Sequence, residues 1–259
     1  MVSFSALQPS RPYEPFLLVA EIDGTLIGDE EGEIRLKTFV KKFPGSLHLA
    51  VVTGHGVPKV GDLLKDGRLP PPDYVCGAVG TELFASNDPK NLIGQRFASR
   101  VPPGWDLETI YALGVGEGIV RQDFPEGQPL FQAGFYWDGR PETLAAFQSR
   151  FAGREGLYIL PSSGKFIDVL PASLGKGNFV WFLLRELGMD PARVVVAGDT
   201  GSDRQMFETE FQGILPANAL EELKAVARQP WHYLSPYPAG RGVLDGLVHF
   251  GLVEGEVPA

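Results

Sequence analysis

Cysteine is almost absent from this sequence of 259 residues, in which Cys76 is the single example. One thiol cannot close a disulfide within the chain, so the sequence excludes a disulfide-stapled fold. Cys76 lies in an apolar stretch, residues 73–79, as is typical of a core residue.

Long apolar runs are absent as well. No segment approaches the ~20 consecutive apolar residues that a membrane-spanning helix needs. Residues 1–15 are interrupted by prolines and lack the apolar segment of a signal peptide. We therefore expect a soluble, cytoplasmic protein that does not act at a membrane.

Basic residues are fewer than acidic ones: the sequence has 23 Lys and Arg and 32 Asp and Glu, which gives a net charge of −9. No basic tract stands out from this background, which argues against a nucleic-acid-binding protein. The negative balance does not exclude an anionic ligand, because a metal ion, a lysine or a helix N-terminus acts locally.

Short apolar stretches alternate with amphipathic ones along most of the chain. Strand segments are predicted within 16–26, 47–54, 73–80 and 193–199, and helices at 34–43, 56–66 and 176–188. This alternation predicts an α/β fold with a doubly wound parallel sheet.

One stretch breaks the alternation. It contains several Pro and Gly residues, a predicted strand at 132–137, a helix at 141–154, and strands at 157–160 and 165–170. We predict an inserted α+β domain at 84–165, with residues 1–83 and 166–259 forming the core domain.

Polar residues follow two of the predicted core strands. Glu21 and Asp23 leave the apolar run 16–20 two residues apart, so both point to the same side. Thr53 and Gly54 follow the run 47–52 and offer a hydroxyl and a free backbone N–H to a phosphate oxygen. Ligands of open parallel sheets bind beyond the carboxyl ends of the strands, so this edge is where we expect a site.

Two later motifs supply a cation and more carboxylates. Lys176, between Gly175 and Gly177, opens a predicted helix and places its ammonium beside a phosphoryl group. Asp199 and Asp203 follow the strand segment 193–199 and are hard oxygen ligands. Carboxylates gathered at one edge repel one another unless a cation lies among them, so the sequence predicts Mg²⁺.

Each motif alone is typical of an ordinary turn or helix cap; their joint occurrence in this order favours a phosphate site. Together they resemble the haloacid dehalogenase superfamily, and within it the sugar-phosphate phosphatases with a C2-type (class IIB) cap, such as sucrose-phosphate phosphatases. Residues 79–83 (Val-Gly-Thr-Glu-Leu) and 166–171 (Phe-Ile-Asp-Val-Leu-Pro) extend the resemblance over nearly the whole chain.

The resemblance implies a phosphoaspartyl-type mechanism. Glu21 stands at the nucleophile position, and Asp23 would protonate the leaving sugar oxygen and then deprotonate water. The implied phosphate-binding residues are Thr53, Gly54, Lys176 and Ser202, and the implied Mg²⁺ ligands are Glu21, Asp23, Asp199 and Asp203.

Three positions depart from the family pattern. Ser202 replaces the usual asparagine, and His55 stands where arginine is common. Glu21 replaces the aspartate nucleophile and lengthens its arm by about 1.5 Å, and a misplacement of ~1 Å at a reacting centre costs roughly 10²-fold in rate.

Two functions therefore stay open. The first is a Mg²⁺-dependent phosphatase acting on a phosphorylated sugar, with sucrose 6-phosphate as the first candidate and other glycosyl, amino-sugar and hexose phosphates as alternatives. The second is a pseudo-phosphatase that holds a sugar phosphate, or docks on a glycosyltransferase partner, without hydrolysis.

A cap above the phosphate site excludes water and selects the leaving group. The predicted substrate contacts are therefore residues at the mouth of the site or in the insertion, namely His55, Glu82, Trp137 and Lys165.

Overall fold

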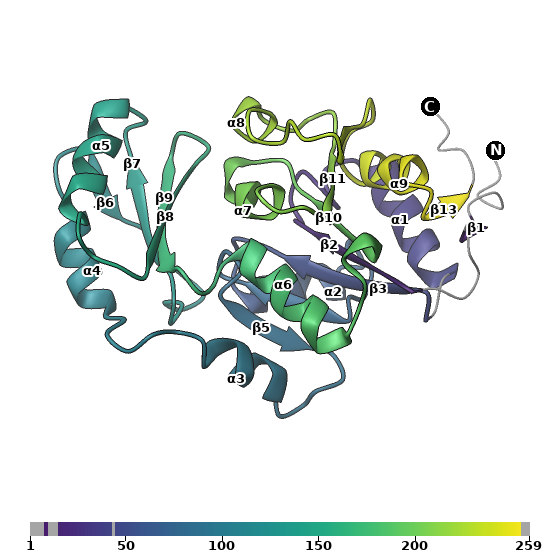
Figure 1. Cartoon of the computed structure of the whole chain (residues 1–259), viewed down its shortest axis with the longest axis horizontal. Helices are drawn as coiled ribbons and strands as arrows, with labels where there is room; N and C mark the ends of the chain where they lie inside the picture. Colours follow the sequence, from purple (N-terminus) through teal and green to yellow (C-terminus); the bar gives the residue numbers. More distant parts are fainter. Residues whose placement is uncertain (1–7, 10–14, 43–44, 255–259) are drawn as a thin grey trace.

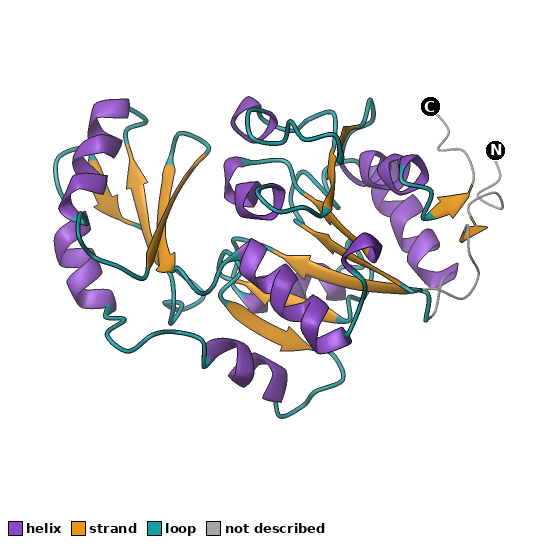
Figure 2. Cartoon of the chain, in the orientation of Figure 1, coloured by secondary structure: helices purple, strands orange, loops and turns teal. Residues whose placement is uncertain are grey.

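The computed structural model describes residues 8–9, 15–42 and 45–254 (Figure 1). These residues form two main parts, each built around its own sheet. Figure 2 shows helices on both sides of the larger sheet, whereas the helices of the smaller part lie on the side that faces away from the larger part. The predicted α/β class, with a parallel-rich central sheet and an inserted α+β part, is confirmed.

The larger sheet has seven strands in the order β12-β11-β10-β2-β3-β4-β5. Its neighbouring strands are parallel except for β4 and β5, which pair antiparallel. The strands are β2 (Phe16–Ala20), β3 (Leu47–Val52), β4 (Tyr74–Gly77), β5 (Glu82–Ala85), β10 (Val194–Ala197), β11 (Gln212–Leu215) and β12 (His232–Leu234).

The central strand β2 is buried on both faces, which explains its unbroken apolar sequence. Phe16, Leu18 and Ala20 join one core cluster, with side chains from α1 (Glu30–Lys42), α2 (Val57–Lys65) and α9 (Ala239–His249). Leu17 and Val19 join a second cluster on the opposite face. That cluster includes side chains from α3 (Leu92–Ala98), α6 (Lys176–Leu187), α7 (Arg204–Phe207) and α8 (Glu221–Lys224). The sheet is therefore doubly wound, as predicted.

The smaller part is a four-stranded antiparallel sheet in the order β6-β7-β9-β8. Its elements are β6 (Ile119–Arg121), β7 (Ala133–Trp137), β8 (Leu157–Ser162), β9 (Phe166–Pro171), α4 (Leu107–Gly114) and α5 (Pro141–Arg150). One face packs on the two helices through a core that contains Phe135 and Phe147, with ring centroids 5.1 Å apart. The other face of this sheet is turned toward the larger part (Figure 2). We call the whole smaller unit the cap.

The strand pairing differs from the predicted domain limits at both ends of the insertion. β9 pairs with β7 and β8 in the cap sheet, although the predicted limit at residue 165 places it in the core domain. β5 and α3 pack on the larger sheet, although residues 84–98 lie in the predicted insertion. Local sequence pattern shows that a strand forms but not which sheet it joins.

The predicted helices are present with shifted ends. α1 begins at Glu30, ahead of the predicted start at 34, since three glutamates in its first turn suit the positive end of a helix. Residue 43, the predicted end, lies outside the described residues. The helix expected at 176–188 is α6.

Short elements complete the chain. Two 3₁₀ turns, η2 (Pro191–Arg193) and η3 (Gly201–Asp203), flank β10, and β1 (Gln8–Pro9) pairs with β13 (Val253–Glu254). Within the residues described, no helix has the length and apolarity needed to cross a bilayer.

The turn after β4 contacts both the end of β3 and the start of α6. Ala78, Val79 and Gly80 all have left-handed backbones, with φ of 51°, 57° and 83°, and this conformation is costly for a β-branched valine. The turn is held by Val79 N–H donating to the Thr53 carbonyl (2.9 Å) and Gly175 N–H donating to the Gly80 carbonyl (3.0 Å). It therefore fixes the start of α6 relative to the end of β3.

A methyl group at Gly80 tests this arrangement. An added Cβ would lie 2.4 Å from the Lys176 backbone nitrogen, so Gly80→Ala must displace the start of α6. We expect the free energy of unfolding, measured by denaturant titration, to fall by about 3 kcal/mol or more. Gly67→Ala is the matched control, because Gly67 has φ of +66° and open space around it; it should lose only about 1 kcal/mol. Equal losses in the two variants would contradict the contact.

Candidate active site

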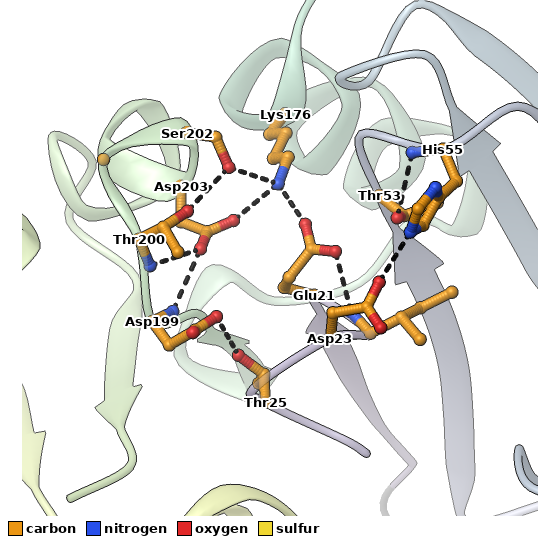
Figure 3. Close-up of polar contacts among 12 residues, drawn as sticks. Glu21, Asp23, Thr25, Thr53, His55, Lys176, Asp199, Thr200, Ser202 and Asp203 are labelled. Atoms are coloured by element: carbon orange, nitrogen blue, oxygen red, sulfur yellow. Dashed lines mark hydrogen bonds and ion pairs between the residues drawn. The ribbon is translucent and has the colours of Figure 1, made fainter. Parts of the chain in front are cut away.

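Three neighbouring strands deliver polar residues to one edge of the larger sheet. Glu21 follows β2, Thr53 follows β3, and Asp199 comes just after β10, and these strands are adjacent in the order β10-β2-β3. Glu21 N–H donates to the Ala197 carbonyl at 3.0 Å, which extends the pairing of β2 and β10 into the site. The carboxyl ends of the parallel strands therefore meet as the sequence predicts, and Figure 3 shows the side chains together.

The Lys176 ammonium lies at the centre of this group (Figure 3). It is 1% exposed and donates to Asp203 Oδ1 at 2.7 Å, to Ser202 Oγ at 3.0 Å and to Glu21 Oε2. Burial by itself lowers the pKa of Lys176, but the two carboxylates outweigh it and the net shift is upward. Lys176 is therefore charged throughout the physiological range.

Both oxygens of Glu21 are engaged. Oε2 accepts from the Lys176 ammonium, and Oε1 accepts from the Ile22 backbone N–H at 3.0 Å. Burial raises the pKa of Glu21, and Lys176 opposes this shift without cancelling it. The carboxylate is thus held in one orientation, with its charge balanced by the ammonium.

Asp199 is closely surrounded by Thr25 and Gly24. Its Oδ1 accepts from the Thr25 hydroxyl at 2.9 Å, and a Cβ at Gly24 would lie 2.2 Å from its Oδ2. Gly24 also has φ of +73°, so a glycine is needed there for both conformation and space. Burial, followed by the charge of Asp203, raises the pKa of Asp199 to about 7.

Asp203 ties the loop after β10 to the helix α6. It is fully buried, and its Oδ2 accepts from the backbone N–H groups of Asp199 and Thr200 at 3.0 Å each. Its Oδ1 accepts from Lys176. These contacts fix the loop that carries Asp199 and Ser202.

Asp23 points away from this buried group toward His55. Asp23 Oδ2 and His55 Nε2 are 2.8 Å apart, and both residues are exposed. The hydrogen bond from His55 lowers the pKa of Asp23, and the same bond raises the pKa of His55. Thr53 supports the pair, because its Oγ1 accepts from the His55 backbone N–H at 3.2 Å.

The predicted metal ligands are brought to one edge but not into a closed cluster. Glu21, Asp199 and Asp203 are buried, whereas Asp23 is turned to His55. In residues 8–9, 15–42 and 45–254, no three His, Cys, Asp or Glu side chains form a ready-made metal-binding group.

A cavity of about 260 Å³ lies between this edge and the cap. From the larger domain it is lined by Glu21, Asp23, Thr53, Gly54, His55, Val79, Thr200 and Ser202. From the cap it is lined by Gln122, Gln132, Ser162, Ser163, Phe166 and Asp168. The cavity therefore has a charged end on the core and a polar end on the cap.

Of the four predicted substrate contacts, His55 lines this cavity and the other three do not. Trp137 lies on the helix-covered face of β7 with Phe135. Glu82 accepts from the Leu130 backbone N–H at 3.2 Å. The Lys165 ammonium is 5.1 Å from the centre of the Phe166 ring.

Two buried cap residues at the polar end of the cavity were not predicted from the sequence. Gln132 Nε2 donates to Asp168 Oδ1 at 2.7 Å, and the residues are 2% and 5% exposed. Gln132 Oε1 is buried and has no hydrogen-bond partner among the described residues. Burial raises the pKa of Asp168 to about 6. The sequence feature that could have indicated Asp168 is a carboxylate inside an otherwise apolar strand, residues 166–171.

Comparison with known proteins agrees with this geometry. A family model described as Sucrose-6F-phosphate phosphohydrolase matches residues 14–251. A mannosylfructose-phosphate phosphatase of Agrobacterium fabrum is 30% identical over 242 residues, which cover 91% of this chain and 97% of that protein.

Solved structures show the same architecture. The sucrose-phosphatase of Synechocystis sp. PCC6803, in complex with sucrose and phosphate, is 26% identical with a TM-score of 0.83, covering 92% of this chain and 98% of that one. A haloacid dehalogenase subclass IIB sugar phosphatase has a TM-score of 0.66 at 15% identity, covering 92% and 99%.

The fold and site thus define a phosphatase of the haloacid dehalogenase type with an inserted cap, which confirms the resemblance seen in the sequence. Within that class, the chain belongs to the sucrose-6F-phosphate phosphohydrolase family.

The buried Asp168 predicts a pH-dependent difference in stability. Its folded-state pKa of about 6 lies above the ordinary value of 3.8, so ionisation destabilises the fold as pH rises from about 4 to about 6. Asp168→Asn keeps an acceptor for Gln132 but cannot ionise. We expect it to exceed the native protein in free energy of unfolding by about 1–3 kcal/mol at pH 7, with the difference vanishing near pH 4. A difference that does not change with pH would contradict this assignment.

Proposed function

We propose that this chain hydrolyses the phosphate ester of a phosphorylated sugar, with the help of Mg²⁺, in the cavity between Glu21 and Asp168. The observation that carries the proposal is the cavity itself, which joins a core end backed by the Lys176 ammonium to a cap end that presents hydrogen-bond acceptors. Sucrose 6-phosphate and mannosylfructose phosphate are the first candidates, because relatives named for these substrates cover most of the chain.

The core end has the groups that a phosphoryl group requires. The Thr53 hydroxyl and the open backbone at Gly54 line the cavity, together with Ser202. The Lys176 ammonium donates to Ser202 Oγ, so it lies directly behind this wall. Positive charge and N–H or O–H donors fixed in advance stabilise the charge that develops during phosphoryl transfer.

The cap end suits the hydroxyl groups of a sugar. Gln132 Oε1 and the Asp168 carboxylate are acceptors, and sugar hydroxyls are donors that match them. A buried acceptor without a partner costs about 1–3 kcal/mol until a ligand supplies one. The Phe166 ring adds an apolar surface for the C–H face of a sugar ring.

The charges of the site fit a divalent cation. Three buried carboxylates, Glu21, Asp199 and Asp203, are opposed by the single ammonium of Lys176. The raised pKa of Asp199 shows that its ionised form is disfavoured in this state. Glu21 and Asp199 would hold Mg²⁺, which when bound offsets negative charge on the phosphoryl oxygens.

The chain's own residues account for the two steps of the reaction. A Glu21 oxygen attacks phosphorus, the bond from phosphorus to the sugar oxygen breaks, and Asp23 gives that oxygen a proton. Water then attacks phosphorus, Asp23 takes its proton, and the Glu21 carboxylate is released with inorganic phosphate. His55 Nε2, at 2.8 Å from Asp23 Oδ2, can exchange this proton with Asp23.

A second function is favoured by one specific contact. Glu21 reaches Lys176 with Oε2, so the carboxylate at the nucleophile position is engaged by the cation that should receive the phosphoryl group. This contact, with the longer arm of glutamate, favours a protein that binds a sugar phosphate with little or no turnover.

Phosphate release from a panel of sugar phosphates, with and without Mg²⁺, tests the proposal. We expect release from a phosphorylated disaccharide that depends on Mg²⁺, and Asp199→Asn should lose Mg²⁺ binding in calorimetry together with release. Glu221→Ala, a change at an exposed residue that does not line the cavity, is the control. Binding of sugar phosphate without release would support the second function. Neither binding nor release would contradict both.

A further inference from the structure

One glutamate outside the cavity contacts both the cap and the larger domain beside the cavity wall. Glu222 on α8 accepts from the Gly201 backbone N–H at 2.7 Å through Oε1. The same carboxylate accepts from the Ser163 backbone N–H, at 2.9 Å to Oε1 and 3.1 Å to Oε2. Ser163 lies in the turn between β8 and β9 of the cap, whereas Gly201 begins η3 of the larger domain.

Both contacted residues adjoin functional groups. Ser163 itself lines the cavity. Gly201 precedes Ser202, which also lines the cavity, and Asp203, which pairs with Lys176. Figure 1 shows the β8–β9 turn at the end of the cap sheet that lies toward α7 and α8.

The backbone at both contacts is adapted to receive the carboxylate. Ser163 has φ of +55°, a left-handed conformation that is uncommon for a residue with a side chain. A Cβ at Gly201 would lie 2.7 Å from Glu222 Cδ, so glycine is required for this close approach.

Strand β8 of the cap lies against η3, and two further contacts at the junction lie away from that loop. Val79 packs against Leu160 and Leu170 of the cap, and Glu82 accepts from the Leu130 N–H. They hold the cap near the core, but they leave Ser202 and Asp203 untouched.

We propose that Glu222 is a positioning residue that couples closure of the cap to the order of the loop carrying Ser202 and Asp203. This inference rests on the proposed function. With the cap as seen here, the carboxylate fixes the cavity wall at Ser163 and the loop at Gly201 together. Glu222 is exposed, so water solvates the carboxylate when the cap opens, and the contact can break and reform in each cycle.

Amide hydrogen exchange tests the coupling without relying on catalysis. In Glu222→Ala, we expect exchange at Ser163 and Gly201 to be faster by about 5- to 10-fold, with a smaller effect in Glu222→Gln, which keeps one acceptor oxygen. Glu221→Ala is the matched control, because Glu221 is exposed on the same helix and its carboxylate pairs with Lys224, also on α8, at 3.0 Å. It should match the native protein.

Kinetics give the second readout. Glu222→Ala should raise KM for the preferred sugar phosphate by about 5- to 10-fold. The KM for p-nitrophenyl phosphate, which meets the loop of Ser202 but offers no sugar hydroxyls to the cap, should rise by a smaller factor. Unchanged exchange at both amides, or equal losses on the two substrates, would overturn the proposal. Faster exchange across the whole seven-stranded sheet would mean that Glu222→Ala destabilises the fold. The exchange at Ser163 and Gly201 and the two KM values are then judged in Glu222→Gln instead.

The two proposals fail separately. If the native chain releases phosphate from no substrate, the proposed function is wrong, and exchange at Ser163 and Gly201 still decides the role of Glu222. If the native chain releases phosphate but Glu222→Ala leaves the exchange at Ser163 and Gly201 unchanged, the proposed coupling is wrong and the phosphatase assignment stands.

Discussion

The buried ion pairing of Lys176 is the interaction on which the rest of the site depends. Its ammonium joins Glu21, at the end of β2, to Asp203, in the loop after β10. A buried charge is tolerated only with partners, so the two strand ends and the start of α6 must meet. The turn at Gly80 fixes the start of that helix through its contact with Gly175. The position of the site residues, the balance of their charges and the backbone conformation at Gly80 therefore depend on one another.

The cap completes the site with a different kind of chemistry. Its inner face presents the acceptors Gln132 and Asp168, and the raised pKa of Asp168 shows that this carboxylate is not optimised for stability. The left-handed Val79 and Ser163 are similar departures from locally favoured structure, both at the junction of the two parts. Such departures concentrate where a protein binds and reacts rather than where it only folds.

The sequence predicted the parts of this site that lie directly after core strands. Glu21, Thr53 and Asp199 converge because parallel strands end at one edge, which local pattern reveals. The cap side was not predictable in the same way. Trp137 lies on the face of the cap sheet that the helices cover, whereas Asp168 lies on the opposite face. Which face the Asp168 side chain takes depends on the sheet that β9 joins, and the sequence does not show that. The role of Glu222 requires contacts across 59 residues of chain, which no local pattern contains.

We propose that the length of the side chain at position 21 limits the turnover of this sugar-phosphate phosphatase. The most direct measurement compares kcat of the native protein with that of Glu21→Asp, at saturating Mg²⁺ and the best sugar phosphate, with Glu21→Gln as the inactive control. Aspartate removes the extra carbon and withdraws the carboxylate from Lys176, so we expect a gain of about 10²-fold in kcat. An aspartate variant no faster than the native protein would contradict it, because glutamate would then already be the fitted nucleophile.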